Sequence, residues 1–356
     1  MKLSFENILN IFLVFVPLPI LGSYLGWSPA IIFFTACLGI VPLAGLMGKS
    51  TEILGDRVGA GAGALLNATF GNACELIIAI AALRHNLIDV VEASLTGSII
   101  GNVLLVLGGA MVVGGCKYQT QYFNRTAAST SATLLALAAI SLTVPAVFHF
   151  SLGAKANVNA NSLAMVIAVI LFITYILSLV FTLKTHKQLY IQADSEVEED
   201  LGVPDWSIRT AVIVLLACTV GVAVLSEYLV HAVEETATSL GVSHIFIGVV
   251  LVAIVGNAAE HSTALLMARK NKMDLAINIA LGSGSQIALL VAPLMVFIGA
   301  AIGHPMDLCF SLVELLAIIV SVIILAFVAT DGECNWLEGA QLLAVYGILA
   351  AAFYFS

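Results

Sequence analysis

Long apolar segments separated by short polar connections make up almost the whole chain. A membrane-spanning helix needs about 20 mostly apolar residues, and the chain offers eleven such stretches. They lie at about 6–26, 28–48, 59–83, 89–115, 124–149, 161–184, 207–230, 243–268, 274–303, 307–330 and 335–355. The pattern predicts an all-α polytopic membrane protein with about eleven transmembrane helices.

Composition agrees with this interpretation. Hydrophobic residues form 61% of the 356 residues, charged residues 10%, and the mean hydropathy is +1.08. A soluble domain has roughly 45–50% apolar and about 25% charged residues, so a soluble enzyme is excluded. The net charge of −9 argues against a nucleic acid partner. The six cysteines form no CxxC pair, so neither a disulfide framework nor a zinc site is expected.

The basic residues predict the orientation of the chain. Short connections rich in Lys and Arg stay cytoplasmic. With the N-terminus inside, eleven of the thirteen basic residues fall on the cytoplasmic side, and only Arg84 and Lys155 fall outside. We therefore expect a retained first helix, a cytoplasmic N-terminus and a C-terminus on the opposite side of the membrane. In a prokaryote this would be the plasma (inner) membrane.

An internal repeat relates the two halves of the chain. With an offset of 185 residues, the segment that begins at Gly71 aligns without gaps to the segment that begins at Gly256, and 13 of 38 positions are identical. The copies begin in the third and eighth predicted helices. Because that offset of five helices is odd, the copies cross the membrane in opposite directions, as in the inverted repeats of secondary transporters.

The repeat divides the chain into four predicted parts. They are an N-terminal helix (1–27), a first five-helix repeat (28–186), a cytoplasmic linker (187–206) and a second five-helix repeat (207–356). The linker carries acids without a base, among them Asp194, Glu196, Glu198, Glu199 and Asp200. Most acidic linkers are solvated connections, and a cation-attracting or regulatory role is the alternative.

Two carboxylates occupy equivalent positions of the repeat. Glu75 and Glu260 are expected about two-thirds of the way along strongly apolar helices. A charge within the membrane costs at least roughly 2.5–3.5 kcal/mol and marks a functional site by default. A purely structural Glu would need a basic partner at that depth, and the predicted helices offer none near their middle.

Polar residues with helical spacing extend this pair to a ligand set. Asn72 and Asn257 lie three residues before the two acids and share their helix faces. The following helices add Ser98 with Asn102 and Ser283 with Gln286, while glycines such as Gly71 and Gly256 allow close backbone approach and can free carbonyls. Hard oxygen ligands of this kind suit Ca²⁺ or Mn²⁺ rather than a soft metal. Protons compete with the cation for the same oxygens, which predicts an antiporter.

These motifs resemble those of the Ca²⁺/H⁺ antiporters (cation/proton exchangers) of the Ca²⁺/cation antiporter superfamily. The most specific are Gly71-Asn-Ala-Cys-Glu75 and Gly256-Asn-Ala-Ala-Glu260-His, with Gly97-Ser98 and Gly282-Ser283-x-x-Gln286. The resemblance covers nearly the whole chain. It implies that Glu75 and Glu260 are the central ligands and carry the coupled protons. It also implies that the acidic linker is the family's acidic helix, and that access alternates by sliding of the outer helices.

The resemblance implies export of Ca²⁺, a transported substrate, in exchange for H⁺, with no cofactor and with the lipid bilayer as surroundings. Three other readings stay open: Na⁺-coupled Ca²⁺ exchange, a cation channel and an intramembrane enzyme. The enzyme is disfavoured because the predicted helices contain no HExxH or paired Asp motif. Glu52 and Glu314 are candidates for a gate or proton path, or are simple helix-end carboxylates. His261 is a further candidate ligand or proton carrier, although it points away from the face of Glu260.

Overall fold

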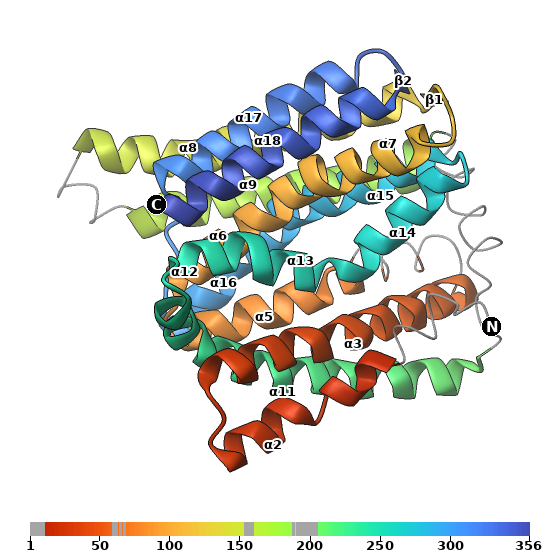
Figure 1. The fold of residues 1–356 in the computed structure, drawn as a ribbon. Coiled ribbons are helices and arrows are strands. Elements are labelled where there is room, and N and C mark those ends of the chain that lie inside the picture. Colours follow the sequence, from red (N-terminus) through yellow and green to blue (C-terminus); the bar gives the residue numbers. More distant parts are fainter. Residues whose placement is uncertain are drawn as a thin grey trace.

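The structure, a computed structural model, describes residues 11–58, 63, 66, 69–152, 160–186, 189 and 206–356. Helices account for almost all of this part of the chain (Figure 1). Element η1 is a 3₁₀-helix, and η2, η4, η6 and η7 are π-helical.

The helices of the first half are η1 (Leu13–Phe15), α2 (Leu18–Leu25), α3 (Pro29–Val58), α5 (Ala73–Arg84), α6 (Ile88–Ile100), η2 (Gly101–Val106), α7 (Leu107–Gly115), α8 (Arg125–Leu152), α9 (Ala160–Val180) and η4 (Phe181–Thr185). Those of the second half are α11 (Ile208–Leu240), α12 (His244–Phe246), η6 (Ile247–Val252), α13 (Ala253–Gly256), α14 (Ala258–Arg269), α15 (Met273–Gln286), η7 (Ile287–Val291), α16 (Ala292–Ile302), α17 (Leu312–Val328) and α18 (Trp336–Phe355). Two short strands, β1 (Gln121–Tyr122) and β2 (Glu333–Cys334), pair antiparallel with Gln121 opposite Cys334.

Each of the eleven predicted segments contains helix in the described part of the chain. Among the described residues, seven helices are long and apolar enough to cross a membrane, and the bent pair His244–Gly256 with Ala258–Arg269 is an eighth candidate. Leu13–Leu25 and Leu312–Val328 are shorter apolar helices. The chain is thus a multi-pass membrane protein, and the number of eleven crossings stays a prediction.

The helix of the second predicted segment extends beyond the apolar stretch that was expected at about 28–48. Helix α3 continues to Val58 and includes Lys49, Glu52 and Arg57. Loss of hydropathy marks where a helix leaves lipid, but Lys, Glu and Arg are good helix formers. The helix therefore extends into the polar stretch that the sequence indicated as a connection.

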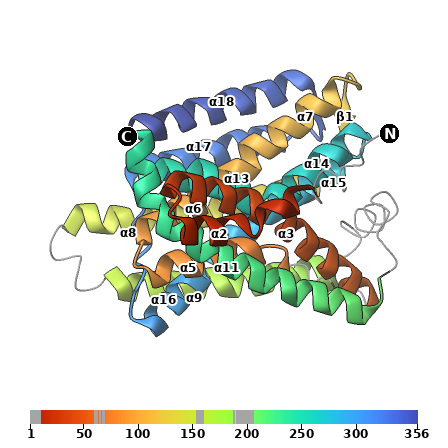
Figure 2. The ribbon, with the colours of Figure 1, turned by 60° about the horizontal axis from the view of Figure 1, so that its bottom comes forward.

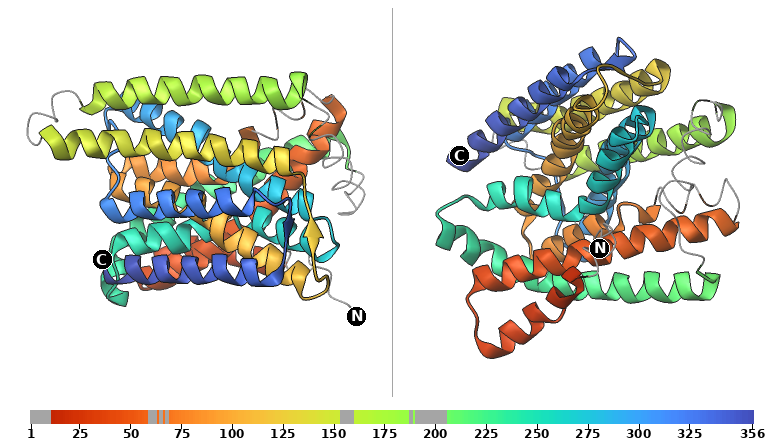
Figure 3. Two further views of the ribbon diagram at one scale, coloured as in Figure 1. Left: turned by 90° about the horizontal axis from the view of Figure 1, so that it is seen from above. Right: turned by 45° about the vertical axis from the view of Figure 1, so that its right-hand side comes forward.

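Apolar side chains cover the outside of the bundle as well as its interior. Phe150, Leu177 and Leu216 are 83%, 62% and 61% exposed on α8, α9 and α11. Figure 3 shows α8 and α9 side by side along one face, and α11 packs along α3 on another (Figure 2). A water-facing surface of this kind would aggregate, whereas lipid would solvate it, so the apolar exterior agrees with a membrane protein.

The same backbone turn occurs in both halves with the predicted offset of 185 residues. After α5, Asn86 has φ 59°, and after α14, Asn271 has φ 65°. In each case the next residue donates its N–H back across the turn, from Leu87 to the Ala82 oxygen (3.0 Å) and from Lys272 to the Met267 oxygen (2.9 Å). This arrangement is a Schellman helix end, and asparagine tolerates its left-handed conformation. The repeated sequence therefore has a repeated local structure.

Connections expected on one side of the membrane contact each other. On the expected cytoplasmic side β1 pairs with β2, and Gln121 bonds Asn271 (3.1 Å). On the other side His304 bonds Asn86 (3.1 Å), and His244 lies 3.6 Å from Asp89. Each of these four contacts joins two connections that are expected on the same side of the membrane.

Candidate functional site

Helix breaks position the two repeat-related carboxylates. Glu75 is the third residue of α5 and Glu260 the third residue of α14, which bends by 63° from the segment before it. The residues at the breaks share one conformation, φ −98° and ψ 20° at Asn72 and φ −94° and ψ 6° at Asn257. Gly71 belongs to the turn before α5, as Gly256 ends α13 before the second break. The sequence did not indicate these breaks directly before the two acids.

The breaks change the electrostatics of the site. A helix N-terminus carries unpaired N–H groups and about half a positive charge, which stabilises a carboxylate in the first turn. Interrupted helices of this kind also free backbone carbonyls for cation coordination inside a membrane protein. The position of Glu75 and Glu260 thus favours a binding site for a cation that is held by carboxylate and carbonyl oxygens.

Six further polar side chains form one hydrogen-bonded network that joins the two halves. Asn257 is central: it donates to the Ser98 hydroxyl (3.0 Å) and to the Ala253 carbonyl (2.9 Å). Its Oδ1 accepts from Asn102 (3.3 Å) and from Ser283 (3.4 Å). Because Ser98 and Asn102 come from the first half, the break in the second half is fixed by residues more than 150 positions away in the sequence.

The other break is held in the same way. The Asn72 amide donates to Gln286 Oε1, and its Oδ1 lies 3.3 Å from the Ser283 hydroxyl, whose single proton Asn72 shares with Asn257. Ser283 also accepts from Asn102 (3.1 Å), which closes the network. Ser98, Asn72, Asn102, Asn257 and Ser283 are all at most 4% exposed. Neither Asn72 nor Asn257 caps its own helix with its side chain, so both are committed to the contacts between the halves.

The two carboxylates lie within this network. Glu75 is 4% exposed, and a Cβ added to Gly256 would lie 3.1 Å from its Cγ. The Ser283 hydroxyl lies within reach of Glu260, and the two acids are close enough to interact electrostatically. Glu75 Oε2, Glu260 Oε2 and Asn102 Oδ1 are buried, and within the described part of the chain none accepts a hydrogen bond. Buried acceptors of this kind are costly unless a cation or a proton satisfies them.

Glycine sets the spacing of the surrounding helices. A Cβ on Gly97 would lie 2.0 Å from the carbonyl oxygen of Val249 in η6, closer than any real contact. The missing side chain therefore lets α6 and η6 touch through their backbones, which brings Ser98 to Asn257. The chain turns π-helical at Gly101, between Ser98 and Asn102, and at Ile287, directly after Gln286. Such π segments occur often at functional sites.

The remaining predicted residues lie outside the network. Glu314 is buried (3% exposed) and caps its own helix: its Oε2 accepts from the Ser311 N–H (2.9 Å), and Thr96 donates to Oε1 (3.4 Å). This contact favours the helix-end interpretation of Glu314. Glu52 is half-buried in the last third of α3. His261 is half-buried, and its Nε2 has no hydrogen-bond partner among the described residues. Asp194, Glu196, Glu198, Glu199 and Asp200 lie outside the described residues.

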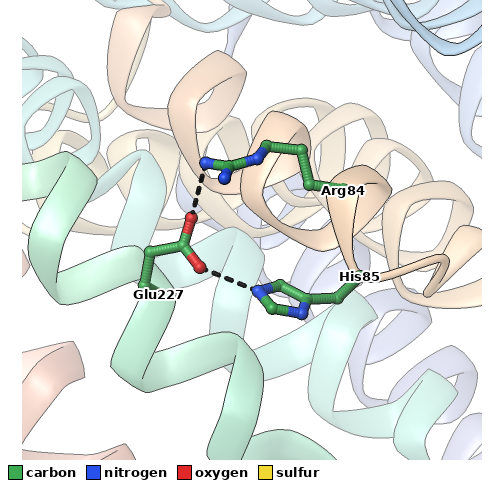
Figure 4. Close-up of polar contacts among 3 residues, drawn as sticks. All are labelled: Arg84, His85 and Glu227. Carbon is green, nitrogen blue, oxygen red and sulfur yellow. Dashed lines mark hydrogen bonds and ion pairs between the residues drawn. The ribbon is translucent and has the colours of Figure 1, made fainter. Parts of the chain in front are cut away.

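The sequence analysis missed one polar cluster, between α5 and α11. Arg84 Nη1 donates to Glu227 Oε1 (2.9 Å), and His85 Nε2 lies 2.7 Å from Oε2 of the same carboxylate (Figure 4). His231 stacks edge-on against His85 with ring centroids 4.3 Å apart. The spacing of Glu227 and His231, one helical turn, was the only available signal, since their partners lie more than 140 residues away.

Comparisons with a family profile, with curated relatives and with solved structures place this architecture among known proteins. The sequence profile of the sodium/calcium exchanger protein family matches residues 28–184 and 210–355. The chain belongs to this family. The two matched segments leave out residues 1–27 and 185–209, which contain the predicted N-terminal helix and the whole predicted linker.

Two curated relatives align with this chain over nearly its full length. It is 45% identical to the Ca²⁺/H⁺ antiporter of Synechocystis sp. over 98% of both chains. It is 45% identical to the Ca²⁺/H⁺ antiporter ChaA of Bacillus subtilis over 95% of this chain and 96% of that one. The solved structure of native YfkE superposes with a TM-score of 0.85 at 42% identity, over 98% of this chain and 100% of that one.

Proposed function

We propose that this protein is a secondary transporter, not an enzyme, which exports Ca²⁺ from the cytoplasm in exchange for protons. The observation that carries the proposal is the group of three buried acceptor oxygens, on Glu75, Glu260 and Asn102, that find no donor in the described part of the chain. The two carboxylates follow the breaks of two repeat-related helices, and Asn102 lies in η2. A site in which three buried acceptors have no donor is suited to a cation.

The chemistry of the donors favours Ca²⁺. The ligands we assign are Glu75, Glu260, Asn72, Asn257, Ser98, Asn102, Ser283 and Gln286, with backbone carbonyls near Gly71 and Gly256. All offer oxygen, which suits the six to eight hard ligands of Ca²⁺. Two carboxylates neutralise one divalent cation. The relatives named Ca²⁺/H⁺ antiporters support the same ion.

Proton coupling follows from the same two carboxylates. When Ca²⁺ leaves, Glu75 and Glu260 lose their counter-charge in a buried place, and protonation restores neutrality. One Ca²⁺ therefore exchanges for about two protons if the swap is electroneutral. His261, Glu52 and Glu314 are candidates to carry protons to the site or to gate it.

Alternating access requires a site that two halves share. We assign the halves to residues 28–186 and 207–356, with an additional helix in 1–27, and the two segments matched by the family profile support this division. The outer pair α3 and α11 would slide past the core that holds the ligands. The acidic segment 187–206 and the N-terminus would face the cytoplasm and the C-terminus the opposite side, in keeping with the two separate groups of connections.

Transport by reconstituted protein tests the proposal. In proteoliposomes with an imposed pH gradient we expect ⁴⁵Ca²⁺ uptake, which Glu75→Gln and Glu260→Gln each abolish because one carboxylate cannot neutralise Ca²⁺. The exposed Glu235→Gln on α11 is the matched control and should transport normally. Normal exchange in either site variant would refute the assignment. Uptake driven by a sodium gradient instead would establish the sodium-coupled alternative, and voltage-dependent flux without a counter-ion would establish a channel.

A further inference from the structure

His85, Glu227 and His231 form a second group of potential metal ligands, separate from the transport site. One nitrogen or oxygen from each lies within 4.8 Å of those of the other two. His85 ends α5, whereas Glu227 and His231 occupy successive turns of α11. Helix α11 begins at Ile208, so at 1.5 Å per residue Glu227 lies about 28 Å along it, near the far edge of the hydrocarbon layer. The group is thus at the membrane surface.

The donors of this group select a different class of ion from the transport site. Two imidazoles and one carboxylate are the ligands of Zn²⁺ and similar transition metals, and imidazole is a poor ligand for Ca²⁺. In the structure His85 Nε2 and Glu227 Oε2 are 2.7 Å apart, joined by a hydrogen bond. Two ligands of a tetrahedral Zn²⁺ lie about 3.3 Å apart. A small rotation of two partly exposed side chains is enough to admit the ion.

The surroundings leave room for an ion and for a further ligand. An open pocket is lined by His85, Leu87, Val230, His231 and Glu234. Glu234, one turn beyond His231, offers a second carboxylate to the same pocket. Arg84 holds the other oxygen of Glu227, as hydrogen bonds commonly fix a ligating carboxylate. Its side chain is 64% exposed, so solvent and salt screen its charge from a bound cation.

Metal at this place would tie two helices together. Helix α5 carries Glu75 in its first turn and His85 at its end, and α11 packs along α3. We propose that His85, Glu227 and His231 bind a Zn²⁺-class cation that bridges α5 to α11, and that the filled site inhibits exchange. The inhibition rests on the proposed function, because it requires α11 to move relative to α5 during transport. The binding itself does not depend on that function.

Equilibrium binding tests the site directly. Purified full-length protein in lipid nanodiscs is titrated with Zn²⁺ against a fluorescent zinc chelator. The double variant His85→Ala/His231→Ala lacks two of the three ligands, so its affinity for Zn²⁺ at this site should fall at least 100-fold. The control is His244→Ala/His304→Ala, which removes two histidines from the same end of the bundle that pair with Asp89 and Asn86. Unchanged Zn²⁺ binding in the first variant would overturn the proposal.

Transport measurements test the inhibition. We expect Zn²⁺ added on the side of this cluster to inhibit Ca²⁺/H⁺ exchange by wild type and by the control. The His85→Ala/His231→Ala variant should keep its basal exchange and need at least tenfold more Zn²⁺ for half-inhibition. Half-inhibition of the double variant and of wild type at the same Zn²⁺ concentration would overturn the inhibitory role. His231→Gln alone serves as a milder variant if the double one does not fold. If wild type exchanges no Ca²⁺, the proposed function fails, while the binding experiment still decides the metal site.

Discussion

Replacement of Gly97 by alanine should disrupt the transport site from a distance, through the backbone. The added Cβ would lie 2.0 Å from the Val249 carbonyl oxygen and 2.6 Å from the Val249 Cα and carbonyl carbon. An ordinary contact begins near 3.4 Å. The helix α6 and the segment η6 must therefore separate by about 1.4 Å, since 3.4 − 2.0 = 1.4.

That displacement exceeds what the polar network can absorb. Asn257 donates to Ser98, the neighbour of Gly97, across 3.0 Å, and a hydrogen bond is lost beyond about 3.5 Å. Overpacking of a core costs about 1–3 kcal/mol, and the lost bond between buried amide and hydroxyl adds about 1 kcal/mol. We expect Gly97→Ala to lower the thermal stability of the purified protein and to reduce Ca²⁺/H⁺ exchange more than tenfold.

A glycine in the same transmembrane segment provides the control. A Cβ on Gly109 in α7 would meet only the Leu265 Cδ1, at an ordinary 3.8 Å. Gly109→Ala should therefore keep both the melting temperature and the exchange rate of the wild type. If Gly97→Ala also behaves like wild type in both measurements, the backbone contact between α6 and η6 does not exist as described.

Two further outcomes concern orientation and stability. A membrane-impermeant maleimide should label the exposed Cys116 in inside-out vesicles and not in intact cells, after Cys309 is replaced by serine. Cys334, on the same side, should stay unlabelled at pH 8. Burial, reinforced by the nearby Glu338 and Glu333 carboxylates, raises the pKa of its thiol to about 12, which leaves about one thiolate in ten thousand. Labelling of Cys116 in intact cells would contradict the predicted orientation. Asn335→Ala removes a side chain that accepts from the Leu337 and Glu338 N–H groups (3.0 and 3.3 Å) at the start of α18. It should cost about 1 kcal/mol of stability without changing exchange, whereas Asn335→Ser keeps the cap, and an equal loss of thermal stability in both variants would contradict the capping role.

The positions of the helices could be predicted because lipid imposes a simple rule on sequence. Backbone groups in hydrocarbon must be paired within a helix, so each crossing leaves a long apolar stretch. The 185-residue repeat was visible because residues such as Asn72 and Asn86 recur at equivalent positions. Both asparagines have structural tasks that composition alone would not produce, one at a helix break and one in a left-handed turn.

The shape of the site was less predictable. The stretch 243–268 is apolar enough on average to be predicted as one span, so hydropathy does not reveal the 63° bend at Asn257. The pairing of Asn72 with Gln286 joins residues 214 positions apart, and no local pattern encodes it. The His85, Glu227 and His231 cluster stayed hidden for the same reason. Residue types and spacing indicated the ligands, but only the fold shows which of them contact each other.

The network between the halves has a consequence for how the protein is made. Asn72 enters the membrane early in synthesis, and its partner Gln286 follows 214 residues later. At a translation rate of 5–20 residues per second, this delay is about 10–40 s. Throughout that interval the polar residues of the first half lie in or beside the bilayer without their partners from the second half; these residues are Asn72, Glu75, Ser98 and Asn102. The nascent first half is therefore the stage at which this protein is most exposed to misassembly and degradation.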